Sequence, residues 1–169
     1  MNEKISILIT GGTIDSYFDP ITESVLTNQE DAIGKYLDLM QLHLDYSINP
    51  ICQKDSRDIT KEDRENILSF IQKSQNKFFL VTHGTFTMAD TARFIKKNEK
   101  ELSDKTIVFT GSMKPLKGFQ DSDAMFNLGF ALASLLLLKP GIYVSMNGEN
   151  FNPEEVYKNI TKGRFEIFK

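Results

Sequence analysis

The chain has 169 residues and a formal net charge of −3, with 20 Lys and Arg against 23 Asp and Glu. This length suits one domain and leaves too little chain for a second independent core. The weakly acidic charge argues against a nucleic-acid binder, and no apolar run is long enough to span a bilayer. We therefore expect a single domain over residues 1–169, with neither nucleic acid nor a membrane as partner.

Cysteine usage and missing motifs narrow the class of protein further. The single cysteine, Cys52, excludes an intramolecular disulfide and a multi-cysteine metal site. Only a short apolar stretch follows Met1, so no secretory signal is apparent. The glycine spacings of dinucleotide-binding and P-loop proteins are also missing. These observations favour a cytoplasmic protein that uses no metal and no cofactor.

The first half of the chain alternates between short apolar runs and stretches of helical periodicity. Residues 5–9 (ISILI) form a continuous apolar run before two glycines, which predicts a strand covered on both faces. Residues 31–42 carry apolar side chains at helical spacing and predict a helix. A weaker strand is expected at 46–52, where Pro50 favours an edge position or an early end. Thr60, followed by acidic residues, predicts the N-cap of a second helix.

The second half continues this alternation. Strands are predicted at residues 77–81, 106–109 and 142–145, and helices at 87–97 and 122–138. Alternating strands and helices predict a doubly wound α/β fold, a three-layer α/β/α domain of Rossmann or flavodoxin-like type with a mainly parallel sheet. The tail after Asn147 is irregular and then charged, and the pattern gives it no place in the sheet.

Glycines and hydroxyl side chains follow several predicted strands. The loop segments that share this composition are TGGTI at 10–14, THGTFT at 82–87, TGS at 110–112 and MNG at 146–148. In doubly wound folds, ligands bind outside the carboxyl ends of the strands, where these loops gather. Glycine permits sharp turns and close approach to a ligand, and threonine supplies a hydroxyl. One such loop is usually only a turn, but several at one edge predict a binding site.

These segments resemble the signature segments of the bacterial-type L-asparaginase family. The resemblance is carried by TGGTI at 10–14, DSRDIT at 55–60, THGTxTM at 82–88, FTGSMKP at 109–115, SDAMFNL at 122–128 and YVSMNGENFNP at 143–153. The resemblance covers nearly the whole chain but only the family's N-terminal domain. The chain is most similar to short members of the family that lack the C-terminal domain. The resemblance implies the asparaginase N-terminal type of α/β fold.

The resemblance implies an amidohydrolase that converts L-asparagine or a related small amide to acid and ammonia. Thr13 matches the family's threonine nucleophile and Thr85 its second essential threonine. A threonine hydroxyl needs a neighbouring base, and in the family a lysine beside the second threonine serves this purpose. Lys158 and Lys162 both match that lysine; they are four residues apart and would share a face of a helix. Tyr17 matches a tyrosine on a mobile lid that orients the nucleophile.

Other positions match the family's substrate-binding residues. Ser56 matches the residue that binds the substrate carboxylate, and Asp55 precedes it. The alternative for Ser56 is a loop hydroxyl that caps nearby backbone. Gly12 lies within the first motif, and the backbone N–H groups near Gly84 and Thr85 are expected to hold a carboxylate or a developing oxyanion. His83 is expected to be a packing and hydrogen-bonding residue rather than a base.

One position departs from the family pattern. Phe86 stands where the family has an aspartate that, by the resemblance, supports the lysine and pairs with the substrate α-ammonium group. A phenylalanine does neither, and losing such a charge-assisted contact costs on the order of 1.5–3 kcal/mol. Asp15 and Asp90 are the alternative sources of a carboxylate.

The sequence leaves three functions open. They are an asparaginase-type amidohydrolase, a hydrolase shifted to a substrate without the α-ammonium group, and a domain that binds a small ligand without turnover. The resemblance also implies a homo-oligomer, because family members are oligomers with sites near subunit boundaries.

Overall fold

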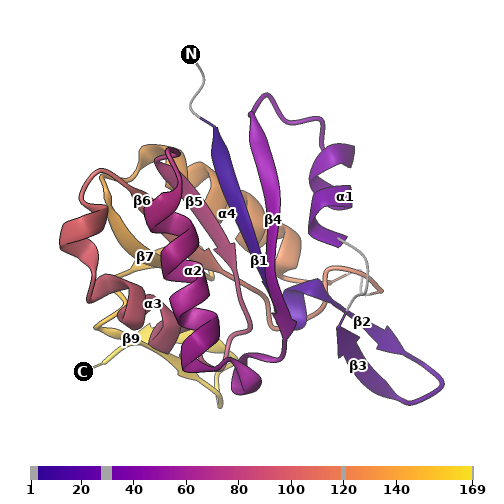
Figure 1. The fold of residues 1–169 in the computed structure, drawn as a ribbon. Coiled ribbons are helices and arrows are strands. Elements are labelled where there is room, and N and C mark those ends of the chain that lie inside the picture. The colour runs from indigo at the N-terminus through magenta and orange to yellow at the C-terminus, as the bar shows by residue number, and fades with distance from the viewer. Residues whose placement is uncertain (1–3, 28–31, 119–120, 169) are drawn as a thin grey trace.

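The computed structural model describes residues 4–27, 32–118 and 121–168. Within these residues the core is a six-stranded sheet in the order β4-β1-β5-β6-β7-β8 (Figure 1). Its strands are β1 (Ile5–Gly11), β4 (Tyr46–Lys54), β5 (Phe78–Thr82), β6 (Thr106–Thr110), β7 (Gly141–Met146) and β8 (Glu149–Phe151). All neighbouring strands pair in parallel except β7 and β8, which are antiparallel. The predicted α/β fold with a mainly parallel sheet is confirmed.

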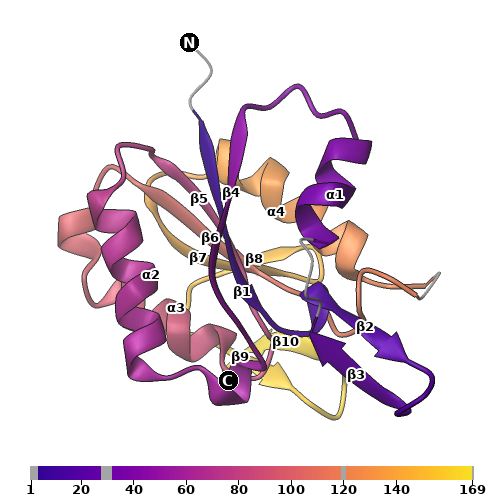
Figure 2. The same cartoon turned by 45° about the vertical axis from the view of Figure 1, so that its right-hand side comes forward.

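Helices cover both faces of the sheet (Figures 1 and 2). Helices α2 (Lys61–Lys73) and α3 (Met88–Lys96) lie on one face, and α1 (Ala32–Leu39) and α4 (Ala124–Leu137) lie on the other. Successive side chains of a strand point to opposite faces, so Phe79 and Val81 join the α2–α3 core while Leu80 joins the α1–α4 core. This division explains why central strands such as β5 and β6 carry apolar side chains on both faces.

Two predicted features of the first half have a clear physical basis. β4 is an edge strand, and it continues past Pro50 to Lys54 rather than ending early, because an edge position tolerates the missing N–H donor. Thr60 caps α2, with Thr60 and Asp63 forming a reciprocal capping box. The helix predicted at 31–42 is shorter: Asp31 lies outside the described residues, and α1 ends at Leu39 before Gln41 adopts a φ of 46°.

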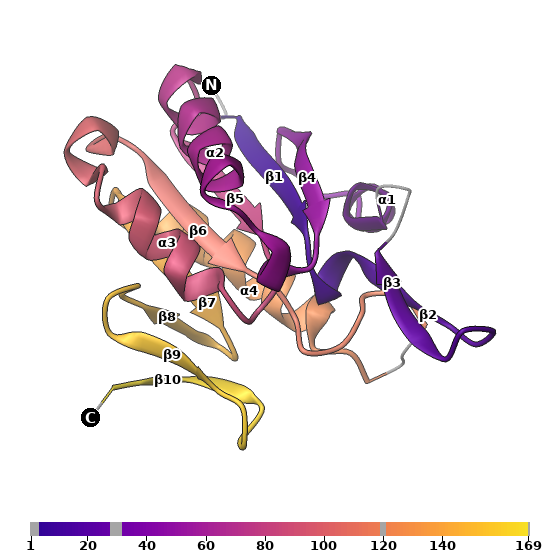
Figure 3. The same ribbon diagram turned by 60° about the horizontal axis from the view of Figure 1, so that its bottom comes forward.

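The tail after Asn147 forms regular structure that the sequence pattern did not predict (Figure 3). β8 joins the sheet, and β9 (Val156–Asn159) pairs with β10 (Arg164–Ile167) as an antiparallel hairpin. We call β9, β10 and the turn between them the C-terminal hairpin. Val156 and Phe165 anchor it by packing into the core on the α2–α3 side of the sheet. A helical arrangement of Lys158 and Lys162 is therefore wrong, because Lys158 lies on β9 and Lys162 in the turn.

A second hairpin projects from the body of the domain near α1 (Figure 3). It comprises β2 (Ser16–Asp19) and β3 (Ser24–Thr27), and it follows a short 3-10 helix at Thr13–Asp15. Several of its apolar side chains are exposed, Ile21 among them at 91%. Within residues 4–27, 32–118 and 121–168, no helix combines the length and apolarity needed to cross a membrane.

Candidate functional site

The loops after β1, β4 and β5 meet at the carboxyl edge of the sheet, where they pack closely around two glycines. A Cβ on Gly12 would lie 2.3 Å from Gly84 Cα, and a Cβ on Gly84 would lie 2.7 Å from Ser56 Oγ. Gly12 also has a φ of 78°, which side chains other than glycine rarely adopt. This glycine contact brings Thr13 and Thr85, the next residue in each loop, to the same place, as expected for adjacent parallel strands.

Thr85 is joined to the C-terminal hairpin by a direct hydrogen bond. Lys158 Nζ donates to Thr85 Oγ1 at 2.7 Å, and Thr85 is only 3% exposed. Partial burial lowers the pKa of Lys158, and the nearby Arg57 guanidinium lowers it further, while Asp55 acts in the opposite direction. A lysine with a lowered pKa loses its proton more readily than one in water, so this pair has the chemistry of a proton relay.

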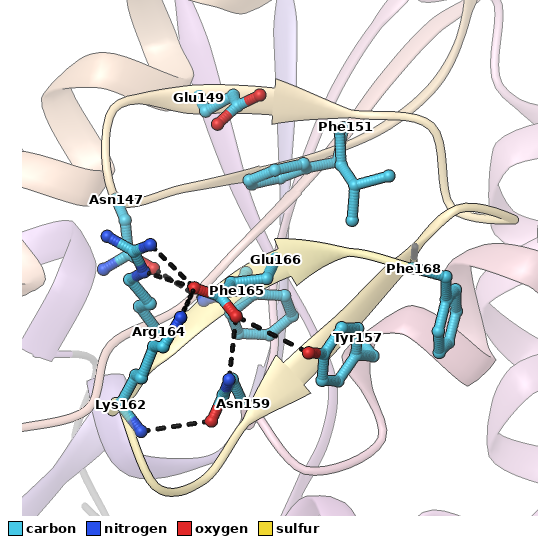
Figure 4. Close-up of a pocket in the computed structure, with 11 residues that line it drawn as sticks. Asn147, Glu149, Phe151, Tyr157, Asn159, Lys162, Arg164, Phe165, Glu166 and Phe168 are labelled. Atoms are coloured by element: carbon cyan, nitrogen blue, oxygen red, sulfur yellow. Dashed lines mark hydrogen bonds and ion pairs between the residues drawn. The ribbon is translucent and has the colours of Figure 1, made fainter.

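Lys162 has different surroundings (Figure 4). Its Nζ donates to Glu166 Oε1 at 2.9 Å, beside Arg164, which donates to the same oxygen. Hydrogen bonds from Lys162, Asn159 and Arg164 lower the pKa of Glu166 to about 2. These side chains line a surface hollow of about 810 Å³ between β8 and the C-terminal hairpin. Of the two candidate lysines, the structure thus brings Lys158 and not Lys162 to Thr85.

Phe86 lies beside two cations. Its ring centroid is 3.8 Å from Lys158 Nζ and 5.0 Å from Arg57 Cζ, distances typical of cation–π contacts, and its side chain is 49% exposed. Arg57 is held by Asp55: Nε and one terminal nitrogen each donate to a carboxylate oxygen at 2.9 Å. This ion pair lowers the pKa of Asp55. The sequence motifs did not single out Arg57, although it directly follows Ser56 in the loop of residues 55–60.

Ser56 is 2% exposed and anchors this loop through its backbone, because its carbonyl accepts a hydrogen bond from Thr87 Oγ1 at 2.5 Å. The capping group of the loop is Asp55, whose side chain accepts from Arg57 N. Within the described part of the chain, the Ser56 hydroxyl has no hydrogen-bond partner, and neither does that of half-buried Thr13. The capping alternative for Ser56 is therefore not what the structure contains.

Of the remaining candidates, Tyr17 lies on the β2–β3 hairpin, and the side chains of Asp15 and Asp90 already accept hydrogen bonds. Tyr17 pairs with Leu26 across the β2–β3 hairpin and is 38% exposed. Asp15 is fully buried and accepts a hydrogen bond from Gln53. Asp90 lines a pocket of about 220 Å³ with Thr85, Phe86 and Lys158, but Arg93 holds its carboxylate at 2.8 Å.

His83 is fully buried at the base of the site. Its Nδ1 donates to the Gly84 carbonyl at 2.8 Å, and its ring makes an edge contact with Phe109. Burial lowers the pKa of His83 to about 4, so the ring is neutral at pH 7. These contacts match the expectation of a packing residue. Within the described residues, no three His, Cys, Asp or Glu side chains gather closely enough to hold a metal ion.

Comparison with known proteins shows which family the chain is similar to. The family model described as "Asparaginase, N-terminal" matches residues 4–169. L-asparaginase 2 of Escherichia coli (strain K12) is 29% identical over 168 residues, covering 94% of this chain and 47% of that protein. The chain spans about half the length of the curated relatives it matches.

Solved structures give the same picture. The structure of L-asparaginase I from Vibrio cholerae superposes with a TM-score of 0.81 at 25% identity, covering 99% of this chain and 52% of that one. A probable cytoplasmic L-asparaginase from Campylobacter jejuni superposes with a TM-score of 0.80 at 27% identity, covering 98% and 52%.

Proposed function

The chain belongs to the asparaginase family, whose N-terminal domain it matches over residues 4–169, and from this premise we propose that it is an amidohydrolase. Its substrate would be L-asparagine or a related small amide, which it would convert to acid and ammonia. The observation that carries the proposal is the hydrogen bond from Lys158 Nζ to Thr85 Oγ1. Thr85 directly follows Gly84, which is packed against Gly12, and Thr13 directly follows Gly12.

Thr13 is the proposed nucleophile. It begins the 3-10 helix after β1 and is partly exposed, and its hydroxyl has no hydrogen-bond partner in the described residues. In the proposed reaction, Thr13 Oγ1 forms a bond to the amide carbon and the C–N bond breaks. The nitrogen takes up the hydroxyl proton and leaves as ammonia, and water then cleaves the ester to release the acid.

Thr85 and Lys158 are proposed to move the proton. The lowered pKa of Lys158 increases the share of its neutral form near pH 7, and this form accepts a proton through Thr85. Ser56, with its hydroxyl unengaged in the described residues, is proposed to bind the substrate carboxylate. Backbone N–H groups at Gly84 and Thr85 would face the developing oxyanion, close to Gly12. Tyr17 would close over the site on the β2–β3 hairpin.

An ammonia-release assay over a panel of small amides tests this proposal. Thr13→Ala is expected to lower kcat by roughly a thousandfold or more, because the attacking oxygen is removed. Thr161→Ala, which changes an exposed threonine in the turn of the C-terminal hairpin, serves as the matched control and should retain full activity. Absence of ammonia release from every amide by the unchanged protein would refute the proposal.

A second candidate, ligand binding without turnover, is favoured by one contact. The Lys158 ammonium lies 3.8 Å from the Phe86 ring centroid, and a cation–π contact stabilises the protonated lysine rather than the base. Calorimetry with aspartate and asparagine beside the ammonia assay separates the two functions. Binding with no turnover supports the second candidate, whereas turnover excludes it.

We also propose that the protein self-associates and acts in the cytoplasm. Self-association is supported by apolar side chains exposed on the β2–β3 hairpin and along α4, such as Ile21 at 91%, Phe126 at 60% and Leu137 at 85%. The location is supported by the likeness to the probable cytoplasmic L-asparaginase of Campylobacter jejuni. Light scattering coupled to size-exclusion chromatography tests the first of these; a monomer at all concentrations would contradict it.

A further inference from the structure

We propose that the site around Phe86 selects amides of dicarboxylic acids that carry no α-amino group, with Arg57 as the residue that binds the distal carboxylate. This inference rests on the proposed amidohydrolase function and names the substrate class of the same site. It follows from three observations on charge, on the pairing of carboxylates and on groups left available for a ligand.

The first observation is the positive charge around the Phe86 ring. Lys158 Nζ and Arg57 Cζ lie 3.8 and 5.0 Å from the ring centroid, so the π face that attracts cations is already in use. A substrate ammonium group entering here would meet the Arg57 guanidinium and, whenever Lys158 is protonated, a second like charge at short range. Such a meeting is unfavourable and selects against α-amino acids.

The second observation is that the nearby carboxylates are already paired. Asp55 binds Arg57 through two side-chain hydrogen bonds of 2.9 Å and also accepts from its backbone N–H at 2.8 Å. Asp90, which lines a pocket together with Phe86, is held by Arg93 at 2.8 Å. Asp58 is exposed on the same turn as Arg57 and adds to the field on that guanidinium. Arg57 and Arg93 thus partly neutralise the two carboxylates nearest to Phe86, which weakens their attraction for a substrate ammonium group.

The third observation is what an anion would find at the same place. Arg57 uses two guanidinium nitrogens on Asp55, and its side chain remains 65% exposed, so further N–H donors stay available. Arg57 and Lys158 also repel one another, which contributes to the lowered pKa of Lys158. A carboxylate held between them would relieve this repulsion. The half-exposed Phe86 ring offers an apolar surface for the methylene groups of the substrate.

The test compares two substrates that share the amide and the carboxylate. Succinamate is L-asparagine without its α-amino group, so the ratio of their kcat/KM values isolates the ammonium. We expect kcat/KM for succinamate to exceed that for L-asparagine by roughly tenfold or more. Equal values, or a preference for L-asparagine, would overturn the inference and leave the proposed function intact.

Four variants, one of them a control, test the comparison further. Arg57→Gln should lower kcat/KM for succinamate by roughly tenfold and that for L-asparagine by less, because the same change also removes a positive charge that opposes the α-ammonium group. Arg164→Gln, which changes an exposed side chain on β10, should change neither value. Phe86→Asp should shift the preference toward L-asparagine. Phe86→Leu keeps an apolar side chain and should preserve the preference, so it remains informative where Phe86→Asp fails to fold. A preference unchanged in both Arg57→Gln and folded Phe86→Asp would also overturn the inference.

A separate binding measurement covers an inactive protein. If no amide is hydrolysed, the proposed function fails, and calorimetry with the two products decides the specificity alone. Succinate binding more tightly than L-aspartate by roughly tenfold supports the charge selection. L-aspartate binding equally or more tightly contradicts it.

Discussion

The candidate site and the turn of the C-terminal hairpin contain the same residue types in opposite surroundings. Each has a lysine and a glycine with positive φ: Lys158 and Gly12 at the site, Lys162 and Gly163 at the turn. At the site the glycine is pressed against backbone and the lysine is half-buried against Thr85. At the turn a Cβ on Gly163 would meet no atom within 4 Å, and Lys162 pairs with Glu166 in solvent. Residue type therefore says little here, and the packing around each residue decides its properties.

The largest effect that separates the two regions is expected from the glycines. Gly12→Ala places a Cβ 2.3 Å from Gly84 at a φ of 78°, so strain and overlap act together, and we expect a loss of about 4 kcal/mol in the free energy of unfolding. Gly163→Ala, at a φ of 61° in open space, should cost about 1 kcal/mol. Denaturant unfolding of both variants measures the difference. Similar losses would mean that the glycine contact at the site is not tightly packed.

The second comparison exchanges each lysine for methionine. Lys158→Met removes the donor to Thr85, and we expect kcat for amide hydrolysis to fall roughly a hundredfold or more. Lys162→Met removes only an exposed ion pair and should leave kcat within about twofold. Steady-state ammonia release by the two variants gives the answer. Equal losses would show that the proposed proton relay does not depend on Lys158.

The third comparison uses pH. If neutral Lys158 accepts the proton, kcat/KM rises with pH as the lysine deprotonates, with a midpoint below the ordinary lysine value of 10.5. Arg57 lowers the pKa of Lys158, so Arg57→Gln should move this midpoint to higher pH. Lys162→Met should leave it in place. If the pH midpoint is the same in Arg57→Gln as in the unchanged protein, the titrating group is not Lys158.

The smallest effect is expected from Glu166 on the turn side. Its folded-state pKa is about 2, below the ordinary value of 4.5, so its ion pairs stabilise the fold above pH 4.5 and this contribution is lost as the pH falls toward 2. Glu166→Gln should therefore lower Tm slightly at pH 7 and have little effect at pH 2, where the carboxylate is largely losing its charge. Thermal unfolding at several pH values checks this. A difference that persists at pH 2 would indicate a packing effect instead.

The sheet and its helices were predictable because the pattern of apolar residues reflects burial directly. Residues 107–109, for example, are all apolar because both faces of the sheet are covered. The meeting of the Thr13 and Thr85 loops was also predictable, since carboxyl ends of parallel strands gather at one edge. Pro50 also correctly predicted that β4 is an edge strand.

The C-terminal hairpin was not predictable from periodicity. β9 and β10 are four residues each and mostly polar, and their conformation depends on tertiary contacts. Phe165 packs into the core, and its N–H donates to Asn147 Oδ1 at 3.0 Å. The choice between Lys158 and Lys162 depended on this hairpin, and so did the contact of Lys158 with Phe86. The contact of Arg57 with the same ring depended on the β4–α2 loop, a second segment without periodic signal.

The hydrogen bond between Lys158 and Thr85 joins residues 73 positions apart, and its donor lies on an element outside the central sheet. Local opening of a peripheral hairpin costs less free energy than unfolding of a core sheet. The hairpin can thus separate from the loops while β1 and β5 remain paired. We expect amide hydrolysis to be lost at a lower denaturant concentration than the far-ultraviolet circular dichroism signal of the sheet. The range of denaturant concentration over which the protein is active would then depend on how firmly β9 and β10 are attached, and not on its global stability.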